Sequence, residues 1–102
     1  MKNIYSEEFE KLTRDNNNIV IDVRTDGEIA EGMIPGALHI DMFAPDFMQQ
    51  IRNLEKDKTY LVYCRSGNRS SSACGAMASL GFKNVYNLIG GIGAWTGTIA
   101  SK

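Results

Sequence analysis

The feature that most constrains the fold of this chain is a series of short apolar runs separated by segments of helical periodicity. The runs are rich in β-branched and aromatic residues and are continuous, which is typical of strands buried on both faces of a parallel sheet. Four such runs are present, at Ile19-Val20-Ile21, Ala37-Leu38-His39-Ile40, Thr59-Tyr60-Leu61-Val62-Tyr63 and Asn84-Val85-Tyr86-Asn87-Leu88. A short strand around Ile4 is a further expectation.

The segments between these runs carry apolar residues at helical spacing, which predicts helices over 7–13, 45–54 and 71–80. Ser6 stands where an N-cap would begin the first helix, and Gly81 stands where a C′ glycine would end the third. Alternation of strands and helices predicts an α/β domain with a mainly parallel sheet. Because the chain has 102 residues, one domain over residues 1–102 is expected.

The composition argues against several classes of function. A formal net charge of −1 gives no electrostatic reason to expect nucleic acid or an anionic membrane as a partner. No apolar run approaches the roughly 18 residues of a membrane span, and the first residues lack the apolar stretch of a secretion signal, so a cytoplasmic protein is expected. Cys64, Cys74 and a single histidine, His39, are too few for a zinc cage, so we expect neither metal nor cofactor.

Two polar segments directly follow predicted strands, in the position where open α/β sheets form their binding sites. The first is Asp22-Val23-Arg24, and the second is Cys64-Arg65-Ser66-Gly67-Asn68-Arg69, called here the Cys64 loop. The Cys64 loop combines a thiol, two arginines and a glycine just before a predicted helix. An inert turn does not need two arginines around a thiol, so this composition favours a functional site.

The physical chemistry of the Cys64 loop favours an ionised thiol. Backbone N–H groups at a helix N-terminus have no intrahelical partner and can bind an anion. The same positive end and the nearby arginines lower the pKa of a thiol and stabilise the thiolate. Gly67 allows the backbone to curl so that successive N–H groups face one centre. A thiolate in such a ring is a prepared nucleophile, and no histidine base is needed.

The chain resembles the rhodanese homology domain family, and the matching segments together span most of the sequence. The early strand motif, the family's Gly-His-Ile-Pro-Gly-Ala signature, its active-site loop and its C-terminal Gly-Gly-x-x-x-Trp motif are matched in order by 21–24, 31–37, 64–70 and 88–95. Met33 stands where the family often has histidine. The resemblance implies a rhodanese-like fold, with a mainly parallel sheet of about five strands and helices on both faces.

The resemblance also implies a sulfurtransferase in which the thiol of Cys64 carries sulfane sulfur as a persulfide. A donor such as thiosulfate would load Cys64, and cyanide or a thiol, including a possible protein thiol, would unload it. The substrate would be bound by the other loop residues, which are Arg65, Ser66, Gly67, Asn68 and Arg69. Arg65 and Arg69 would attract the anion because a guanidinium can bind oxyanions through two hydrogen bonds.

Other candidates are interpreted as structural. Asp22 and Arg24 are expected to support the Cys64 loop from the same sheet edge, the alternative being a surface ion pair. Cys74 is expected to be buried against the sheet, although a resolving thiol is conceivable. His39 is expected to be a satisfied structural histidine, and Trp95 a core anchor that packs the last helix.

Two other functions are considered besides sulfur transfer. Cysteine phosphatases and arsenate reductases of the related loop type place five residues between cysteine and arginine, whereas four separate Cys64 from Arg69. The shorter ring suits a sulfur atom better than a tetrahedral phosphate. The second alternative is a non-enzymatic interaction module or sulfur carrier, because a fold alone does not define a function.

Overall fold

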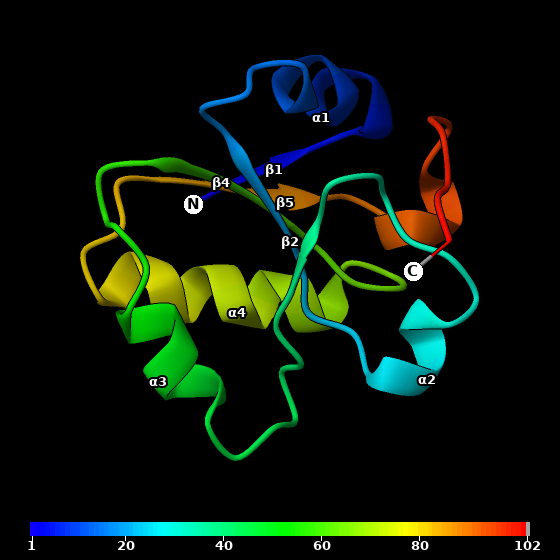
Figure 1. Cartoon of the computed structure of the whole chain (residues 1–102). Helices are drawn as coiled ribbons and strands as arrows, with labels where there is room; N and C mark the ends of the chain where they lie inside the picture. Colours follow the sequence, from blue (N-terminus) through cyan, green and yellow to red (C-terminus); the bar gives the residue numbers. More distant parts are fainter. Residues whose placement is uncertain (102) are drawn as a thin grey trace.

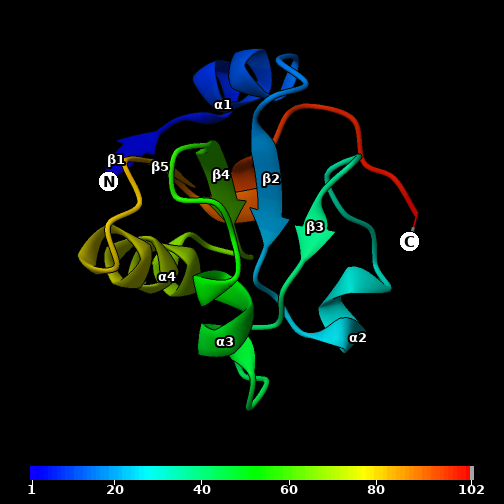
Figure 2. The same cartoon turned by 60° about the vertical axis from the view of Figure 1, so that its left-hand side comes forward.

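The computed structural model describes residues 1–101 and contains a five-stranded sheet with strand order β1-β5-β4-β2-β3. All four strand pairs are parallel, with Ile21 of β2 opposite Val62 of β4 and Leu61 of β4 opposite Tyr86 of β5. The strands are β1 (Lys2–Ile4), β2 (Ile19–Asp22), β3 (Leu38–His39), β4 (Thr59–Tyr63) and β5 (Asn84–Leu88). Their carboxyl ends therefore lie at one edge of the sheet (Figure 2).

Helices cover both faces of this sheet, which confirms the predicted α/β architecture. Figure 1 shows α1 on one face and α3 and α4 on the other. The helices are α1 (Ser6–Thr13), α2 (Asp26–Ile29), α3 (Phe47–Arg52), α4 (Asn68–Ser79) and the 3₁₀ helix η1 (Gly91–Ala94). In the part of the chain that the structure describes, none of these helices has the length and apolar content needed to cross a membrane.

Three helix starts differ from the sequence-based prediction. Helix α1 begins at Ser6 with Tyr5 as its N-cap, because the Ser6 hydroxyl instead contacts Thr96. Helix α4 begins three residues before the predicted start, directly after Gly67, so its first turn includes the end of the Cys64 loop. Helix α3 begins at Phe47, two residues after the predicted start. A fourth helix, α2, was not predicted, because four residues are too short to show a period.

The alternation of side chains along β4 divides the core into two layers. Tyr60 and Val62 pack toward α3 and α4, while Leu61 and Tyr63 pack toward α1. On the α1 side, the Phe9 ring lies edge-on to the rings of Tyr63 and Trp95. Both layers are apolar up to the carboxyl edge of β4, where Cys64 follows. Cys64 itself belongs to the layer on the side of α3 and α4.

Candidate active site

The Cys64 thiol lies at the end of β4, beneath the backbone of the loop that follows it. Its Sγ atom accepts hydrogen bonds from the backbone N–H of Gly67 at 3.1 Å and of Ser70 at 3.4 Å. The Ser70 hydroxyl lies 3.3 Å from the same sulfur. These donors come from the loop and from the first turn of α4, as predicted from the sequence. They form the kind of ring that stabilises negative charge on sulfur.

The 3₁₀ helix η1 holds the Cys64 loop in this shape. The N–H of Ile92 donates to the Cys64 carbonyl at 2.9 Å, and the N–H of Gly93 donates to the Arg65 carbonyl at 3.1 Å. Because a trans peptide points its C=O and N–H in opposite directions, the second bond turns the Ser66 N–H away from η1. Because η1 binds the carbonyls of Cys64 and Arg65, the N–H groups of the loop are left to face the Cys64 sulfur.

Two glycines make this close approach possible. Gly67 is the N-cap of α4 and has a φ of +98°, a left-handed conformation that glycine adopts readily. Gly91 has a φ of +61°, and a Cβ atom there would lie 2.5 Å from the carbonyl oxygens of Cys64 and Arg65. Gly91 therefore allows η1 to pack tightly against the Cys64 loop.

The hydrogen bonds to Cys64 determine its ionisation. Burial alone would raise the pKa of the thiol, but the donors to its sulfur outweigh burial and lower the pKa below its ordinary value. The largest of these lowering effects comes from the Ser70 hydroxyl, followed by the backbone N–H groups of Ser70, Gly67 and Ser66. Cys64 is therefore the more readily ionised of the two cysteines.

Ser70 contacts a second buried residue that the sequence analysis did not identify. Its hydroxyl lies 2.5 Å from Oδ1 of Asn87, and the Asn87 amide donates to the Gly67 carbonyl at 3.3 Å. Asn87 is 4% exposed, so its amide connects β5 to the Cys64 loop in the protein interior. The signal in the sequence was a polar residue beside the apolar end of the strand 84–88.

Replacement of Ser70 by alanine is expected to raise the pKa of Cys64 by about one pH unit. A hydrogen bond to a charged group contributes about 1.5–3 kcal/mol, and about 1.4 kcal/mol corresponds to one pH unit. The lower part of that range applies because the single proton of the Ser70 hydroxyl is shared between the Cys64 sulfur and Oδ1 of Asn87, and because the backbone donors remain. The measurement is a pH titration of thiolate absorbance, with Ser72→Ala on the exposed side of α4 as the control. Equal titration curves for the two variants would contradict this role of Ser70.

Arg69 is the last residue of the Cys64 loop, and its guanidinium is bound to a carboxylate. Two of its nitrogens donate to the two oxygens of Glu28 at 2.8 and 2.7 Å. Glu28 also accepts from the N–H of Thr25 in the capping box of α2, and the Phe43 ring lies 5.8 Å from the guanidinium. Thr25-x-x-Glu28 was the sequence signal for this arrangement. The pair ties α2 to the first turn of α4.

Asp22 and Arg24 form a buried pair, which excludes the surface ion pair considered from the sequence. The Arg24 Nε donates to both oxygens of Asp22 at 3.0 Å, and a terminal nitrogen donates at 2.8 Å. Arg24 also donates to the Gly32 carbonyl at 2.7 Å. The hydrogen bonds of this pair within residues 1–101 thus hold the segment after α2, rather than the Cys64 loop. Its support of the site is indirect.

A pocket of about 290 Å³ lies next to the Cys64 loop. It is lined by Arg24, Glu28, Glu31, Gly32, Arg65, Ile92, Gly93 and Ile99. Charged side chains of both signs and two isoleucines therefore face the space beside the loop. The remaining predicted loop residues, Ser66 and Asn68, are exposed and line a separate pocket together with Gly67.

The weaker candidates have structural surroundings. Cys74 is buried, and its thiol lies 3.7 Å from the Tyr86 carbonyl. His39 Nε2 donates to the Arg24 carbonyl at 2.6 Å. Trp95 follows η1 and packs edge-on against Phe9, as expected of a core anchor. These contacts satisfy each side chain without a catalytic role.

The two cysteines are expected to ionise at different pH values. Burial raises the pKa of Cys74 to about 12, whereas that of Cys64 is lowered. A titration of thiolate absorbance should therefore show one thiolate well before Cys74 ionises. Cys64→Ser should remove that signal and Cys74→Ala should keep it. Loss of the signal in Cys74→Ala alone would overturn this assignment.

Comparisons with known proteins agree with this geometry. The model of the rhodanese-like domain family matches residues 6–98. The chain belongs to the rhodanese-like domain family. YtwF of Bacillus subtilis is 46% identical to this rhodanese-like chain over 93 residues, which are 91% of the chain and 87% of YtwF. Thiosulfate sulfurtransferase GlpE of Ectopseudomonas mendocina is 35% identical over 102 residues, with 99% of this chain and 90% of GlpE covered.

A solved structure shows the same rhodanese-like fold. The crystal structure of a rhodanese-related protein from Thermoplasma volcanium superposes with a TM-score of 0.88 at 27% sequence identity. The match covers 100% of both chains. The order of strands and the loop after β4 therefore belong to a known architecture, as the resemblance implied.

Proposed function

We propose that this sulfurtransferase carries sulfane sulfur as a persulfide on Cys64. The observation that carries the proposal is the ring of hydrogen-bond donors around Sγ from Gly67 and Ser70, at 3.1 to 3.4 Å. This ring stabilises a thiolate before the reaction and a persulfide anion after it, without rearrangement of the protein. It gives Cys64 the two properties that a sulfur carrier needs, nucleophilicity and a stable loaded form.

The proposed reaction has two half-reactions. With thiosulfate, the Cys64 thiolate attacks the outer sulfur, a new S–S bond forms, the old S–S bond breaks and sulfite leaves. In the second half, a thiol or cyanide attacks the outer sulfur of the persulfide and the Cys64 thiolate is regenerated. Thiosulfate is one donor to consider because the relative GlpE is named a thiosulfate sulfurtransferase. The acceptor is proposed to be a small thiol, cyanide or a protein thiol.

The remaining loop residues are proposed to bind the donor. Arg65 is exposed and forms no ion pair within residues 1–101, so it is available to an incoming anion. Ser66 and Asn68 provide exposed polar groups, and Gly67 provides its backbone N–H. Arg69 contributes a weaker attraction because Glu28 neutralises most of its charge. A cytoplasmic location, where thiols are kept reduced, stays a prediction.

The position of Arg69 supports sulfur transfer over phosphate ester hydrolysis. A phosphatase of the related loop type needs its arginine to bind the equatorial oxygens of phosphate. Arg69 instead directs two nitrogens at Glu28. Together with the four-residue spacing from Cys64, this favours a ring for one sulfur atom.

Intact mass spectrometry tests the proposal directly. The protein is treated with thiosulfate, separated from the reagent and weighed, with and without later exposure to cyanide. We expect a gain of one sulfur atom that cyanide removes. A protein that gains no sulfur from thiosulfate or from an alkyl persulfide would contradict the proposed carrier.

A further inference from the structure

Arg65 and Arg69 belong to the Cys64 loop, and Arg24 lines the pocket beside it. Two of these three arginines are already paired with carboxylates. Arg24 is held by Asp22 through three contacts of 2.8 to 3.0 Å. Arg69 is held by Glu28 at 2.8 and 2.7 Å. Arg65 alone of the three forms no ion pair within the described residues. The positive charge offered to a substrate is therefore much smaller than the number of arginines suggests.

The carboxylate of Glu28 is a fixed part of the site. Both the N–H and the hydroxyl of Thr25 donate to its Oε1 at 3.1 Å, so the capping box of α2 holds the side chain in place. Its hydrogen bonds with Arg69 are the largest cause that lowers the pKa of Glu28 to about 2. Glu28 thus remains negatively charged at every pH at which the protein would be assayed.

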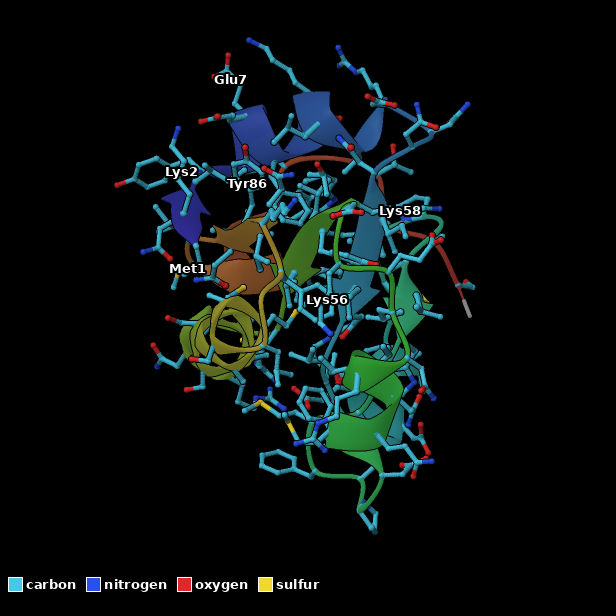
Figure 3. All side chains as sticks on the ribbon, turned by 90° about the vertical axis from the view of Figure 1, so that its left-hand side faces the viewer. Met1, Lys2, Glu7, Lys56, Lys58 and Tyr86 are labelled. Carbon is cyan, nitrogen blue, oxygen red and sulfur yellow. The ribbon has the colours of Figure 1, made fainter. Side chains whose placement is uncertain are left out.

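Other charged groups do not restore a positive field. Glu31 lines the same pocket as Glu28 and is exposed. Lys56 and Lys58 precede β4 and lie at the amino end of that strand (Figure 3). A five-residue strand separates them from Cys64 by about 20 Å, beyond the screening length of about 8 Å at physiological salt.

Donors of sulfane sulfur differ in the charge they bring to this site. Thiosulfate carries two negative charges and must approach a thiolate. An alkyl persulfide carries one negative charge or none. In the transfer from R–S–S–H, the Cys64 thiolate bonds to the outer sulfur, the donor S–S bond breaks and R–S⁻ leaves with the electron pair. The proton stays on the transferred sulfur, and no oxidant or reductant is needed.

We propose that Glu28 determines donor specificity: by neutralising Arg69, it disfavours dianionic donors and directs the site toward alkyl persulfides. This inference rests on the proposed function of Cys64 as the sulfur carrier. Glu28 does not contact the reacting sulfur. It acts through Arg69, whose raised pKa has the Cys64 thiolate among its causes, so the two charges interact. Removal of the Glu28 charge should free Arg69 to attract a second negative charge.

The test compares Glu28→Gln with Glu31→Gln. Both variants remove one negative charge from the same pocket, but only Glu28 pairs with Arg69. Glutamine at position 28 keeps an oxygen that can accept from the Thr25 N–H, so the cap of α2 can persist. Rates of Cys64 loading are measured with thiosulfate and with 2-hydroxyethyl persulfide, which has no other charged group.

Glu28→Gln is expected to raise kcat/KM for thiosulfate by about 3- to 10-fold, mainly through a lower KM, because a unit charge a few ångströms away acts at partial screening. The value for the persulfide should change less than about twofold because the donor carries at most one charge. Glu31→Gln should change both values less than about twofold, since an exposed unpaired charge is well screened. A purely structural role of Glu28 would lower both rates together.

Four results would overturn the proposal. If Glu28→Gln changed kcat/KM by the same factor for both donors, Glu28 would have no role in specificity. The same conclusion would follow if Glu28→Gln and Glu31→Gln changed kcat/KM equally. If Glu28→Gln does not fold, Arg69→Gln is measured instead. In that variant, kcat/KM for thiosulfate must fall by a larger factor than kcat/KM for the persulfide. Wild-type protein that gains sulfur from neither donor would refute the carrier function as well, which distinguishes the two failures.

Discussion

Replacement of Cys64 by serine is expected to reduce sulfur transfer to the uncatalysed background while the protein stays folded. The sulfur atom is both the nucleophile and the carrier, and a serine hydroxyl forms no persulfide. The hydroxyl oxygen is only slightly smaller than the sulfur and could accept the same hydrogen bonds from Gly67 and Ser70, so the loop should persist. Circular dichroism should therefore show an unchanged fold beside the loss of activity.

The measurement combines steady-state transfer from thiosulfate to cyanide with intact mass after loading. Cys74→Ala is the matched control, because it removes the other thiol, which is buried and has a pKa raised to about 12. We expect this control to load one sulfur atom and to keep its transfer rate within about twofold, since its thiol is poorly ionised. Transfer that survives in Cys64→Ser, or that disappears in a folded Cys74→Ala, would contradict the assignment of Cys64.

The sequence predicted the sheet and the donors around the Cys64 sulfur because both depend on local patterns. Continuous apolar runs marked the strands that precede and follow Cys64 in the sequence. Each predicted strand is present in the structure. The composition of the segment 64–69 predicted a ring of donors, which the structure places around Sγ. Strand burial and helix-terminus chemistry are set by neighbours in sequence, so a single chain is enough to recognise them.

Contacts between distant segments were not predicted. The partner of Arg69 lies 41 residues away at Glu28, and the partner of Ser70 lies 17 residues away at Asn87. Each of these side chains has an ordinary local interpretation, as part of a helix start or a strand end. Only the arrangement of β2, β4 and β5 in one sheet brings them to the same edge. The charge balance of the site is therefore a property of the fold.

Gly91→Ala is expected to cause a large loss of stability and to reduce sulfur transfer, because the start of η1 shapes the Cys64 loop. Its φ of +61° lies in the left-handed region, which costs a residue with a Cβ about 1–2 kcal/mol. The added Cβ would also lie 2.5 Å from the Arg65 and Cys64 carbonyls, and overpacking costs about 1–3 kcal/mol. We expect the free energy of unfolding to fall by about 2–5 kcal/mol.

The effect on activity follows from the position of the added Cβ beside the loop carbonyls. It would displace the carbonyls that accept from the N–H groups of Ile92 and Gly93 at 2.9 and 3.1 Å. Rotation of those peptides would turn loop N–H groups away from the Cys64 sulfur and raise its pKa. Gly75→Ala is the matched control, because Gly75 is exposed within α4 and has no atom within 4 Å of an added Cβ. Gly75→Ala should stabilise α4 by about 0.5–1 kcal/mol and leave sulfur transfer unchanged. Equal urea midpoints and equal transfer rates for the two variants would refute the role of η1 in shaping the Cys64 loop.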